Sequence, residues 1–461
     1  MNRLSRSGTW NFCFLLSSTL ITSLLGNVVS AEDEPVSFRR DVAPILLDNC
    51  VACHNAKKAE GGYRIDSFTE LSKAGDSGIA PLEKSAEPMA ELLRRLKTED
   101  DSERMPAESD ALTAAQIKVV ADWIEAGSVF DGQDPQELLP FVIPPRQYPA
   151  SPATYPARLQ VTALTFSRDA NLIYSGGYHE ILAWDAEGNL KGRIGNVGQQ
   201  TYALVLVPGK NQLAVASGSP GFGGEVRIID LSTQEVTAVL ARCNDVILDI
   251  AFRPDGKELA IAAADKSIRI LNMETLETKQ TLLSHADFVT AIAWSEDGKT
   301  LVSGSRDKSA KVFNAETGQL LISYQGHANA VRGVRVLPDG KQVVSTGNDH
   351  KLHRWNISDA KKTAEVAIGG EGYKISSADN CVLVPSSDKR LLKIDLSKNQ
   401  VTTEFKGHAD WVLTSAVNPD QTKVATGAHD GEIKIWNLVD GTLINSWIAQ
   451  PPLSGTAKTK P

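Results

Sequence analysis

The residues best suited to chemistry in this chain lie in one short stretch, NCVACHNAKK, at positions 49–58. Cys50, Cys53 and His54 follow one another there in the order C-x-x-C-H. Two thiols at this spacing with an adjacent imidazole are compatible with a redox disulfide, half of a zinc site, or the covalent attachment of a haem. The residues around the motif have to decide among these three uses.

The neighbouring sequence favours haem attachment. A zinc site needs two further ligands, and residues 32–133 contain no other cysteine or histidine. A thioredoxin-like pair is expected at the start of a helix that follows a strand, whereas the preceding FRRDVAPILLDNC has a helical pattern. Haem attachment uses all three residues, because the thiols of Cys50 and Cys53 form thioethers and His54 is then placed to coordinate the iron.

A six-coordinate iron would need a second axial ligand. The strong-field candidates in the same part of the chain are Met89 and Met105. Met105 lies on a predicted loop beside Pro106, whereas Met89 is expected inside an amphipathic helix, packed with the leucines of ELLRRLK. We therefore favour Met105 as the distal ligand, and an open sixth position is the alternative.

The helix that closes this region is clearly marked in the sequence. Thr113 and Gln116 form a capping box at its start, and Gly127 is expected to end it. Four apolar residues at helical spacing predict its buried face: Ile117, Val120, Ala121 and Ile124.

Four segments of this region together resemble the planctomycete-type cytochrome c domain, a small class I-like cytochrome: DVAPILLDNCVACHN, GGYRIDSFTEL, RMP and LTAAQIKVVADWIEAG. They span nearly all of 36–130. The resemblance implies a mostly helical fold, one covalent haem c with His54 and Met105 as iron ligands, and electron transfer. The family's usual MPP reads Met105-Pro106-Ala107 here, which keeps the ligand and bears only on the rigidity of the loop.

The remainder of the chain is a repeat. Seven tails, ILAWD, VRIID, IRILN, AKVFN, LHRWN, LLKID and IKIWN, recur at intervals of 45, 42, 42, 42, 39 and 42 residues. A period near forty with four short strands in each unit predicts the blades of a β-propeller. Over about 159–449 the sequence resembles the WD-repeat family.

This second resemblance implies a hydrogen-bonded tetrad inside some blades. Two blades hold full sets: His327, Ser345, Asp349 and Trp355, and His408, Thr426, Asp430 and Trp436. A third set has Phe313 in place of tryptophan: His285, Ser303 and Asp307. We therefore expect these histidines to be structural. Four others are expected at strand-joining turns, in contact with solvent: His179, His350, His353 and His429.

Two further segments complete the organisation. Residues 1–31 have a basic start, an apolar middle and small residues before the break after Ala31, which predicts a cleaved export signal; an uncleaved membrane anchor is the alternative. Seven prolines between 131 and 158 exclude regular helix and predict an extended strap between the domains. The predicted order is signal peptide 1–31, cytochrome c domain 32–133, linker 134–158, propeller 159–449 and C-terminal tail 450–461.

Charge is distributed unevenly. Residues 32–133 carry 12 Lys/Arg against 21 Asp/Glu, a net −9, and residues 134–461 carry 34 against 35, a net −1. Neither part has the basic surface that nucleic-acid binding requires. An acidic domain is steered toward a redox partner with a cationic docking face, although an acidic surface without a particular partner explains the charge equally well. Cys243 and Cys381 are expected to be buried and unpaired.

The predicted fold class is thus multidomain: a small all-α cytochrome c domain followed by an all-β, seven-bladed WD-repeat propeller. We expect an exported, periplasmic electron carrier with one covalent haem, whose propeller makes protein–protein contacts and which meets a membrane only through an uncleaved signal segment. One alternative is a periplasmic oxidoreductase whose propeller houses a second catalytic centre, and another is a haem-based redox sensor. Whether the chain is an enzyme stays open.

Overall fold

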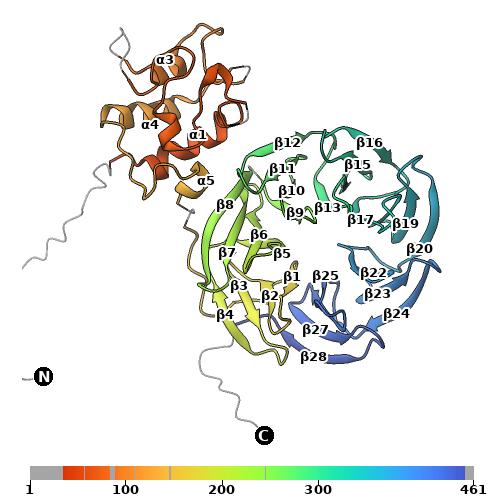
Figure 1. Cartoon of the computed structure of the whole chain (residues 1–461). Helices are drawn as coiled ribbons and strands as arrows, with labels where there is room; N and C mark the ends of the chain where they lie inside the picture. The colour runs from red at the N-terminus through yellow and green to blue at the C-terminus, as the bar shows by residue number, and fades with distance from the viewer. Residues whose placement is uncertain are drawn as a thin grey trace, which may run out of the picture.

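The computed structural model describes residues 35–56, 58–83, 89–107, 109–144, 147–243 and 245–451. A helical region lies beside a ring of β-sheets (Figure 1). The expected signal peptide 1–31, and the tail after residue 451, lie outside the described residues. Among the residues that are described, no helix has the length and apolar character needed to cross a bilayer.

The helical region consists of short helices joined by long turns. Its helical elements are η1 (Phe38–Val42), α1 (Ala43–Asn49), η2 (Glu60–Gly62), α2 (Phe68–Leu71), α3 (Glu91–Lys97), α4 (Ala114–Glu125) and α5 (Leu139–Val142). The predicted capping box is present at α4, where the Thr113 hydroxyl accepts from the Gln116 backbone N–H and the Gln116 side chain accepts from the Thr113 backbone N–H. Gly127 follows α4 with φ +99°, a left-handed conformation that ends a helix without a Cβ penalty.

Aromatic side chains form the centre of this region. The Phe38 ring lies 5.2 Å from the Trp123 ring and 5.0 Å from the Phe68 ring, and Phe130 packs 4.8 Å from Phe68. The Trp123 indole N–H donates to the Val129 carbonyl at 2.9 Å. This cluster joins η1 to α4 and therefore ties the two ends of the helical region together.

The proline-rich segment is less extended than the sequence predicts. Leu139–Val142 form the single helical turn α5, with Pro140 in its first turn, where the missing proline N–H costs no hydrogen bond. Leu139, Val142 and Ile143 are buried in the same core as Phe38 and Trp123. The exclusion of regular helix was therefore wrong, and the beginning of the expected linker is part of the helical core.

Within 147–243 and 245–451 the strands form seven four-stranded antiparallel sheets, each with its strands in chain order. The strands are β1 (Leu164–Phe166), β2 (Ile173–Gly176), β3 (Ile181–Trp184) and β4 (Leu190–Ile194) in blade 1; β5 (Gln200–Leu206), β6 (Gln212–Ser219), β7 (Gly223–Asp230) and β8 (Glu235–Cys243) in blade 2; β9 (Ile247–Phe252), β10 (Glu258–Ala263), β11 (Ile268–Asn272) and β12 (Thr278–Leu282) in blade 3; β13 (Val289–Trp294), β14 (Thr300–Ser305), β15 (Ala310–Asn314) and β16 (Leu320–Tyr324) in blade 4; β17 (Val331–Val336), β18 (Gln342–Gly347), β19 (Lys351–Asn356) and β20 (Lys362–Ala367) in blade 5; β21 (Ser376–Ala378), β22 (Cys381–Pro385), β23 (Arg390–Asp395) and β24 (Gln400–Lys406) in blade 6; and β25 (Val412–Val417), β26 (Lys423–Ala428), β27 (Glu432–Asn437) and β28 (Leu443–Ile448) in blade 7. The seven-bladed propeller predicted from the period is confirmed.

The seven tails are the third strands of the blades, and each ends at an Asp or Asn for a local reason. Asn272, Asn314 and Asp230 each accept backbone N–H groups two residues further along, at 2.9, 2.9 and 2.7 Å. Such Asx turns reverse the chain into the outermost strand. At these three tails the repeated residue is therefore a turn signal.

The ring closes by packing, because every sheet contains only consecutive strands. The Val161 backbone N–H, just before β1, donates to the Ala428 carbonyl of blade 7 at 3.0 Å. Asn445 of β28 donates to the Ala186 carbonyl of blade 1 at 2.9 Å. Blades 1 and 7 share one apolar cluster that includes Trp184 and Ile435.

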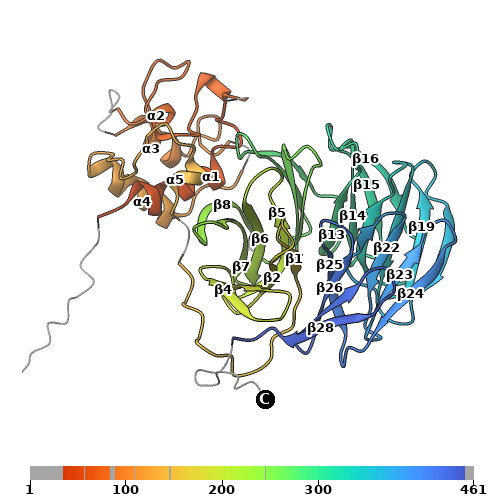
Figure 2. The ribbon, with the colours of Figure 1, turned by 60° about the horizontal axis from the view of Figure 1, so that its bottom comes forward.

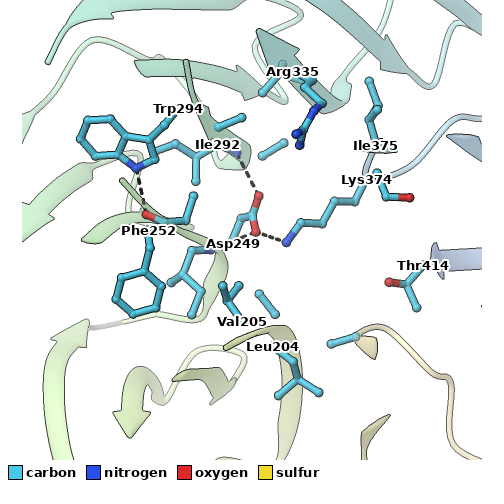
Figure 3. Close-up of a pocket in the computed structure, with 18 of the residues that line it drawn as sticks. Leu204, Val205, Asp249, Phe252, Ile292, Trp294, Arg335, Lys374, Ile375 and Thr414 are labelled. Carbon is cyan, nitrogen blue, oxygen red and sulfur yellow. Dashed lines mark hydrogen bonds and ion pairs between the residues drawn. The ribbon is translucent and has the colours of Figure 1, made fainter. Parts of the chain in front are cut away.

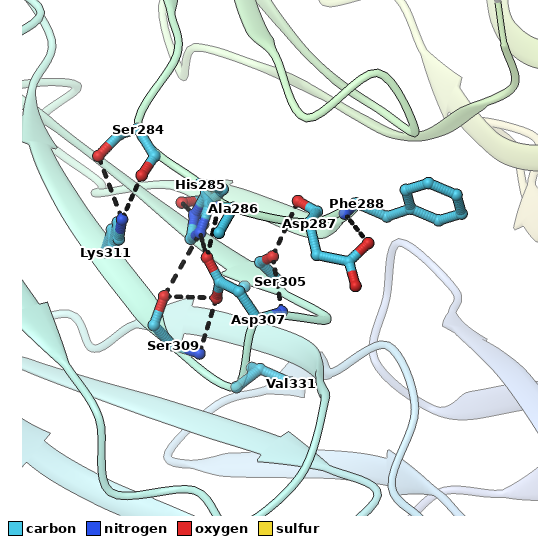
Figure 4. Close-up of polar contacts among 12 residues, drawn as sticks. Ser284, His285, Ala286, Asp287, Phe288, Ser305, Asp307, Ser309, Lys311 and Val331 are labelled. Atoms are coloured by element: carbon cyan, nitrogen blue, oxygen red, sulfur yellow. Dashed lines mark hydrogen bonds and ion pairs between the residues drawn. The ribbon is translucent and has the colours of Figure 1, made fainter.

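The tetrads form in the predicted blades, with one exchange of partner. His285 contacts Asp307 at 2.8 Å (Figure 4) and Ser303 at 2.7 Å. His327 contacts Asp349 and Ser345 at the same two distances. In blade 7, however, the Nδ1 atom of His408 lies 3.0 Å from Glu432. The sequence assigned Asp430 to this place, but the longer side chain two residues later reaches the ring.

Two of the histidines expected at solvated turns are buried. His353 lies within β19 at 1% exposure, and its ring stacks on the ring of His327 at 4.1 Å. His179 is buried with Nδ1 3.1 Å from the Val197 carbonyl. Cys243 is buried and unpaired, and Cys381 is unpaired and half-buried.

Candidate functional site

The C-x-x-C-H motif occupies a single turn at the end of α1. The Cys50 backbone N–H donates to the Leu46 carbonyl at 2.9 Å and so ends the helix. The Cys53 and His54 backbone N–H groups then both donate to the Cys50 carbonyl, at 3.2 and 3.1 Å. Both cysteines are free thiols. Burial, with a smaller contribution from Cys53, raises the pKa of the Cys50 thiol to about 12.

The orientation of His54 is set by a backbone carbonyl. Its Nδ1 atom lies 3.3 Å from the Tyr63 carbonyl oxygen, and a carbonyl can only accept, so Nδ1 carries the proton. The Ile65 backbone N–H donates to the His54 carbonyl at 2.9 Å, which holds residues 63–65 against the motif. Nε2 is then the ring nitrogen through which this imidazole would bind a metal.

Met105 is held by α3. Its backbone N–H donates to the Arg95 carbonyl at 2.9 Å. The Glu91 carboxylate anchors this end of α3, since it accepts from Arg94 and Arg95, both at 2.8 Å. The hydrogen bond from Arg94, followed by that from Arg95, lowers the pKa of Glu91 to about 2. Glu103, in the same loop, pairs with Arg94 at 2.5 Å.

Met89 does not lie inside a helix, contrary to the expectation from the sequence. Ala90 is the N-cap of α3 with ψ 145°, so the helix begins at Glu91 and Met89 lies in the bend before it. The leucines expected around it behave as predicted, because Leu93 and Leu96 are buried. Met105, in contrast, packs against the same apolar core as Cys50, and both remain partly exposed.

These residues suit a c-type haem. The turn brings together two free thiols and an imidazole that is oriented through Nδ1, which are the groups that thioether formation and iron ligation need. The Met105 thioether, at the margin of the same core, is the candidate for a second ligand.

The turn that carries Cys50 starts at the contact between the helical region and the propeller (Figure 2). Helix α5 packs against β8. Leu47 and Val51 face Leu276, which lies in the turn between β11 and β12, across a space of about 10 Å³. Burial raises the pKa of Asp48, while the positive charges of Arg242 and Arg269 oppose this shift.

Comparison with known families agrees with the division of the chain into a helical region and a propeller. The planctomycete cytochrome C model matches residues 50–109. The model of the WD domain, G-beta repeat, matches 235–272, 276–314, 318–356 and 399–437. The first of these stretches covers β8 and then β9, β10 and β11, so a repeat contains the outermost strand of one blade and the three inner strands of the next.

Two curated proteins share the repeats. Over 82 residues, 18% of this chain, the sequence is 30% identical to WD repeat and HMG-box DNA-binding protein 1 from Mus musculus, and the match covers 7% of that protein. Over 70 residues, 15% of this chain, it is 33% identical to WD repeat domain-containing protein 83 homolog from Dictyostelium discoideum, of which 22% is covered. The similarity spans less than a quarter of either relative. Together with the geometry, these matches identify a chain in which a planctomycete-type cytochrome c domain precedes a seven-bladed WD-repeat propeller.

Proposed function

We propose that this protein is an exported c-type cytochrome that transfers electrons through one haem, attached covalently at Cys50 and Cys53. His54 is the proximal iron ligand and Met105 the distal ligand. The observation that carries the proposal is the ring of His54, whose Nδ1 atom is bonded to the Tyr63 carbonyl while Nε2 keeps its lone pair. Haem bound here supplies a one-electron iron couple, which the protein tunes by its ligands and by burial.

Each residue has a separate task. The Cys50 and Cys53 thiols fasten the group, and the carbonyl of Tyr63 keeps the imidazole of His54 in one orientation and one tautomer. The hydrogen bond from the Met105 backbone N–H to the Arg95 carbonyl ties the loop of the distal ligand to helix α3. Ligation by histidine and methionine raises the reduction potential relative to two histidines.

The propeller serves as a rigid protein-docking platform. WD repeats are typical of proteins that bind other proteins, and two large side chains are available for contacts here: Phe222, 87% exposed at the turn between β6 and β7, and Trp411, 46% exposed before β25. The redox partner that we propose has a cationic face, because residues 32–133 carry a net charge of −9 from 12 basic and 21 acidic residues. Export follows from the composition of residues 1–31, with cleavage after Ala31.

The test is a matched pair of methionine variants of the full chain, produced with its N-terminal segment in a bacterial host that matures c-type cytochromes. We expect haem colour to stay with the protein on a denaturing gel, and a weak absorption band of Met ligation near the red edge of the visible spectrum. Met105→Ala should abolish this band and Met89→Ala should keep it. Colour that acid–acetone extracts completely would contradict covalent attachment, and loss of the band in Met89→Ala alone would contradict the assignment of Met105. N-terminal sequencing of the periplasmic fraction tests export, which fails if residues 1–31 are retained in the cytoplasm.

A further inference from the structure

A cavity of about 470 Å³ lies at the centre of the propeller (Figure 3). Among the described residues, its wall takes side chains from the innermost strand of every blade: β1, β5, β9, β13, β17, β21 and β25. A volume of this size lies in the range of sites that enclose small organic ligands. The chemistry of its wall therefore indicates what it would bind.

One side of the cavity is apolar and aromatic. Trp294 and Phe252 lie there next to each other, with Ile292 beside them (Figure 3). The Trp294 indole N–H donates to the Ala251 carbonyl at 2.9 Å, so its only polar group is already satisfied by the protein. This wall can offer a ligand only van der Waals and ring contacts.

The buried acid of the cavity is also satisfied. Asp249 is 1% exposed, and its carboxylate accepts from the backbone N–H groups of Ile250 at 2.9 Å and Ile292 at 3.0 Å. The same carboxylate forms an ion pair with Lys374. The charges of Asp249 and Lys374 thus balance each other.

Arg335 differs from these residues. Its side chain extends from β17 into the cavity (Figure 3), and within the described part of the chain no hydrogen bond or ion pair joins its guanidinium to another side chain. Burial lowers the pKa of Arg335, while the charge of Glu296, an exposed acid elsewhere on the wall, opposes this shift. Arg253, the remaining charged residue of the wall, lies 3.6 Å from Asp255 and 3.5 Å from Glu258. Arg335 is therefore the cationic residue of the wall for which the described residues provide no hydrogen-bonded or ion-paired side chain.

We propose that the central cavity binds a small organic carboxylate, whose carboxylate pairs with Arg335 and whose apolar body packs against Trp294 and Phe252. A planar guanidinium suits a carboxylate, since the two can form parallel hydrogen bonds. A monoanion fits better than a phosphate dianion, because Asp249 already neutralises Lys374 and the charge of Glu296 already acts on Arg335, so little positive charge remains for the ligand. This site is separate from the haem domain and does not depend on the function proposed for it.

The test uses the full-length holoprotein and sodium benzoate as the probe, with the neutral isostere benzamide for comparison, in isothermal titration calorimetry at constant ionic strength. We expect saturable binding of benzoate and markedly weaker binding of benzamide. Arg335→Met, which keeps the length of the side chain and removes its charge, should weaken benzoate binding about tenfold or more. The benzoate affinity of Arg335→Lys should lie between those of the wild type and Arg335→Met, because lysine keeps the charge and loses the bidentate geometry.

The matched control is Arg332→Met. Arg332 lies on the same strand, β17, but outside the cavity wall, where its Nε atom donates to Asn348 at 3.1 Å. Its benzoate affinity should equal that of the wild type. Absence of saturable benzoate binding, equal binding of benzoate and benzamide, or unchanged affinity in a folded Arg335→Met variant would each overturn the proposal. Folding of each variant is checked by circular dichroism, and the Arg335→Lys variant keeps the test decisive if Arg335→Met does not fold.

Discussion

His54 in the cytochrome domain and His327 in blade 5 show opposite uses of the same side chain. His54 has one ring nitrogen bonded, to the Tyr63 carbonyl at 3.3 Å. Both ring nitrogens of His327 are bonded, Nδ1 to Asp349 at 2.8 Å and Nε2 to Ser345 at 2.7 Å. A histidine whose two nitrogens are used within the protein cannot bind a metal without losing those bonds, whereas one with a single bond is oriented and still available.

The elements around these two histidines also differ, since one histidine lies on a turn and the other is bonded to a strand of a sheet. The motif around His54 lies on a turn after a seven-residue helix, where a change of side chain disturbs few neighbours. The partners of His327 lie on or beside the strands of a four-stranded sheet, and Trp355 donates to Ser345 at 3.0 Å to complete the set. The comparison predicts that substitutions in the first region change chemistry, and that those in the second change stability.

The largest effect is expected from removal of both motif thiols. Cys50→Ala with Cys53→Ala should abolish covalent haem, because no thioether can form, while the unfolding transition of the propeller stays unchanged. Haem staining after denaturing electrophoresis measures the first result and circular dichroism the second. Cys381→Ala, in β22 of blade 6, is the control and should stain like the wild type. Staining of the double variant equal to that of the wild type would contradict the chemical role assigned to the motif.

The second effect is on stability. His327→Ala should lower the free energy of unfolding by about 3 kcal/mol, because it opens a cavity in the blade and removes one hydrogen-bond partner each from the buried Ser345 and from Asp349, and it should leave the haem spectrum unchanged. Urea unfolding followed by tryptophan fluorescence measures the loss. His429→Ala, whose side chain is half exposed, should cost less than about 0.5 kcal/mol. If the two variants lose the same stability, the tetrad is not structural.

The third effect is a pH dependence of the free energy of unfolding. Burial, with a smaller contribution from the charge of His327, lowers the pKa of His353 to about 4 from its ordinary 6.5; Lys362 acts in the same direction, and Asp349 and Glu365 oppose it. The folded state then favours neutral His353, so its contribution to stability is complete above pH 6.5 and is lost as the pH falls toward 4.

On unfolding at a pH between 4 and 6.5, His353 takes up a proton, and His353→Gln removes this uptake. The free energy of unfolding of the variant should therefore fall less between pH 6.5 and 4, by at most about 1.4 kcal/mol per pH unit. Urea midpoints at several pH values measure the slope. His408, whose pKa burial lowers to about 4 as well, keeps part of the dependence in the variant. Identical slopes in both proteins would show that His353 does not contribute.

The smallest effect is expected in the loop of Met105. Glu91→Gln weakens the bonds to Arg94 and Arg95 and should destabilise the loop by about 1 kcal/mol. Since the pKa of Glu91 is lowered to about 2 from 4.5, its stabilising charge is complete above pH 4.5 and is lost as the pH falls toward 2. The band of Met ligation should therefore fade at a higher pH in the variant than in the wild type. Glu99→Gln, at an exposed position, is the control and should not move that transition.

Several features of the fold could be predicted because they depend on neighbouring residues. The Thr113–Gln116 capping box appears as predicted. The Asx turns at Asp230 and Asn272, at the ends of third strands, likewise involve residues within three positions of each other. The predicted seven blades are confirmed as well, because the period repeats a local pattern of strands and turns.

Two of the wrong predictions involve the reach and burial of side chains. Glu432 replaces Asp430 beside His408 because, across the turn at Gly431, its longer side chain reaches the ring. His353 was expected in a turn, yet it lies in β19 with its Nδ1 atom 2.9 Å from the Tyr324 hydroxyl of the preceding blade. Neither the geometry of such a turn nor a contact between blades can be inferred from the spacing of residues.

The sequence by itself determined the reactive motif, the repeat and the two-part organisation, because thioether chemistry needs only Cys50, Cys53 and His54 in order and a propeller needs only its period. The tertiary structure alone decided that His54 is bonded through Nδ1, that both ring nitrogens of His285, His327 and His408 are bonded, and that Arg335 reaches the central cavity beside the balanced pair of Asp249 and Lys374. The physical reason is that the availability of a polar group depends on the hydrogen-bond partners that folding brings to it, and most of those partners lie far away along the chain.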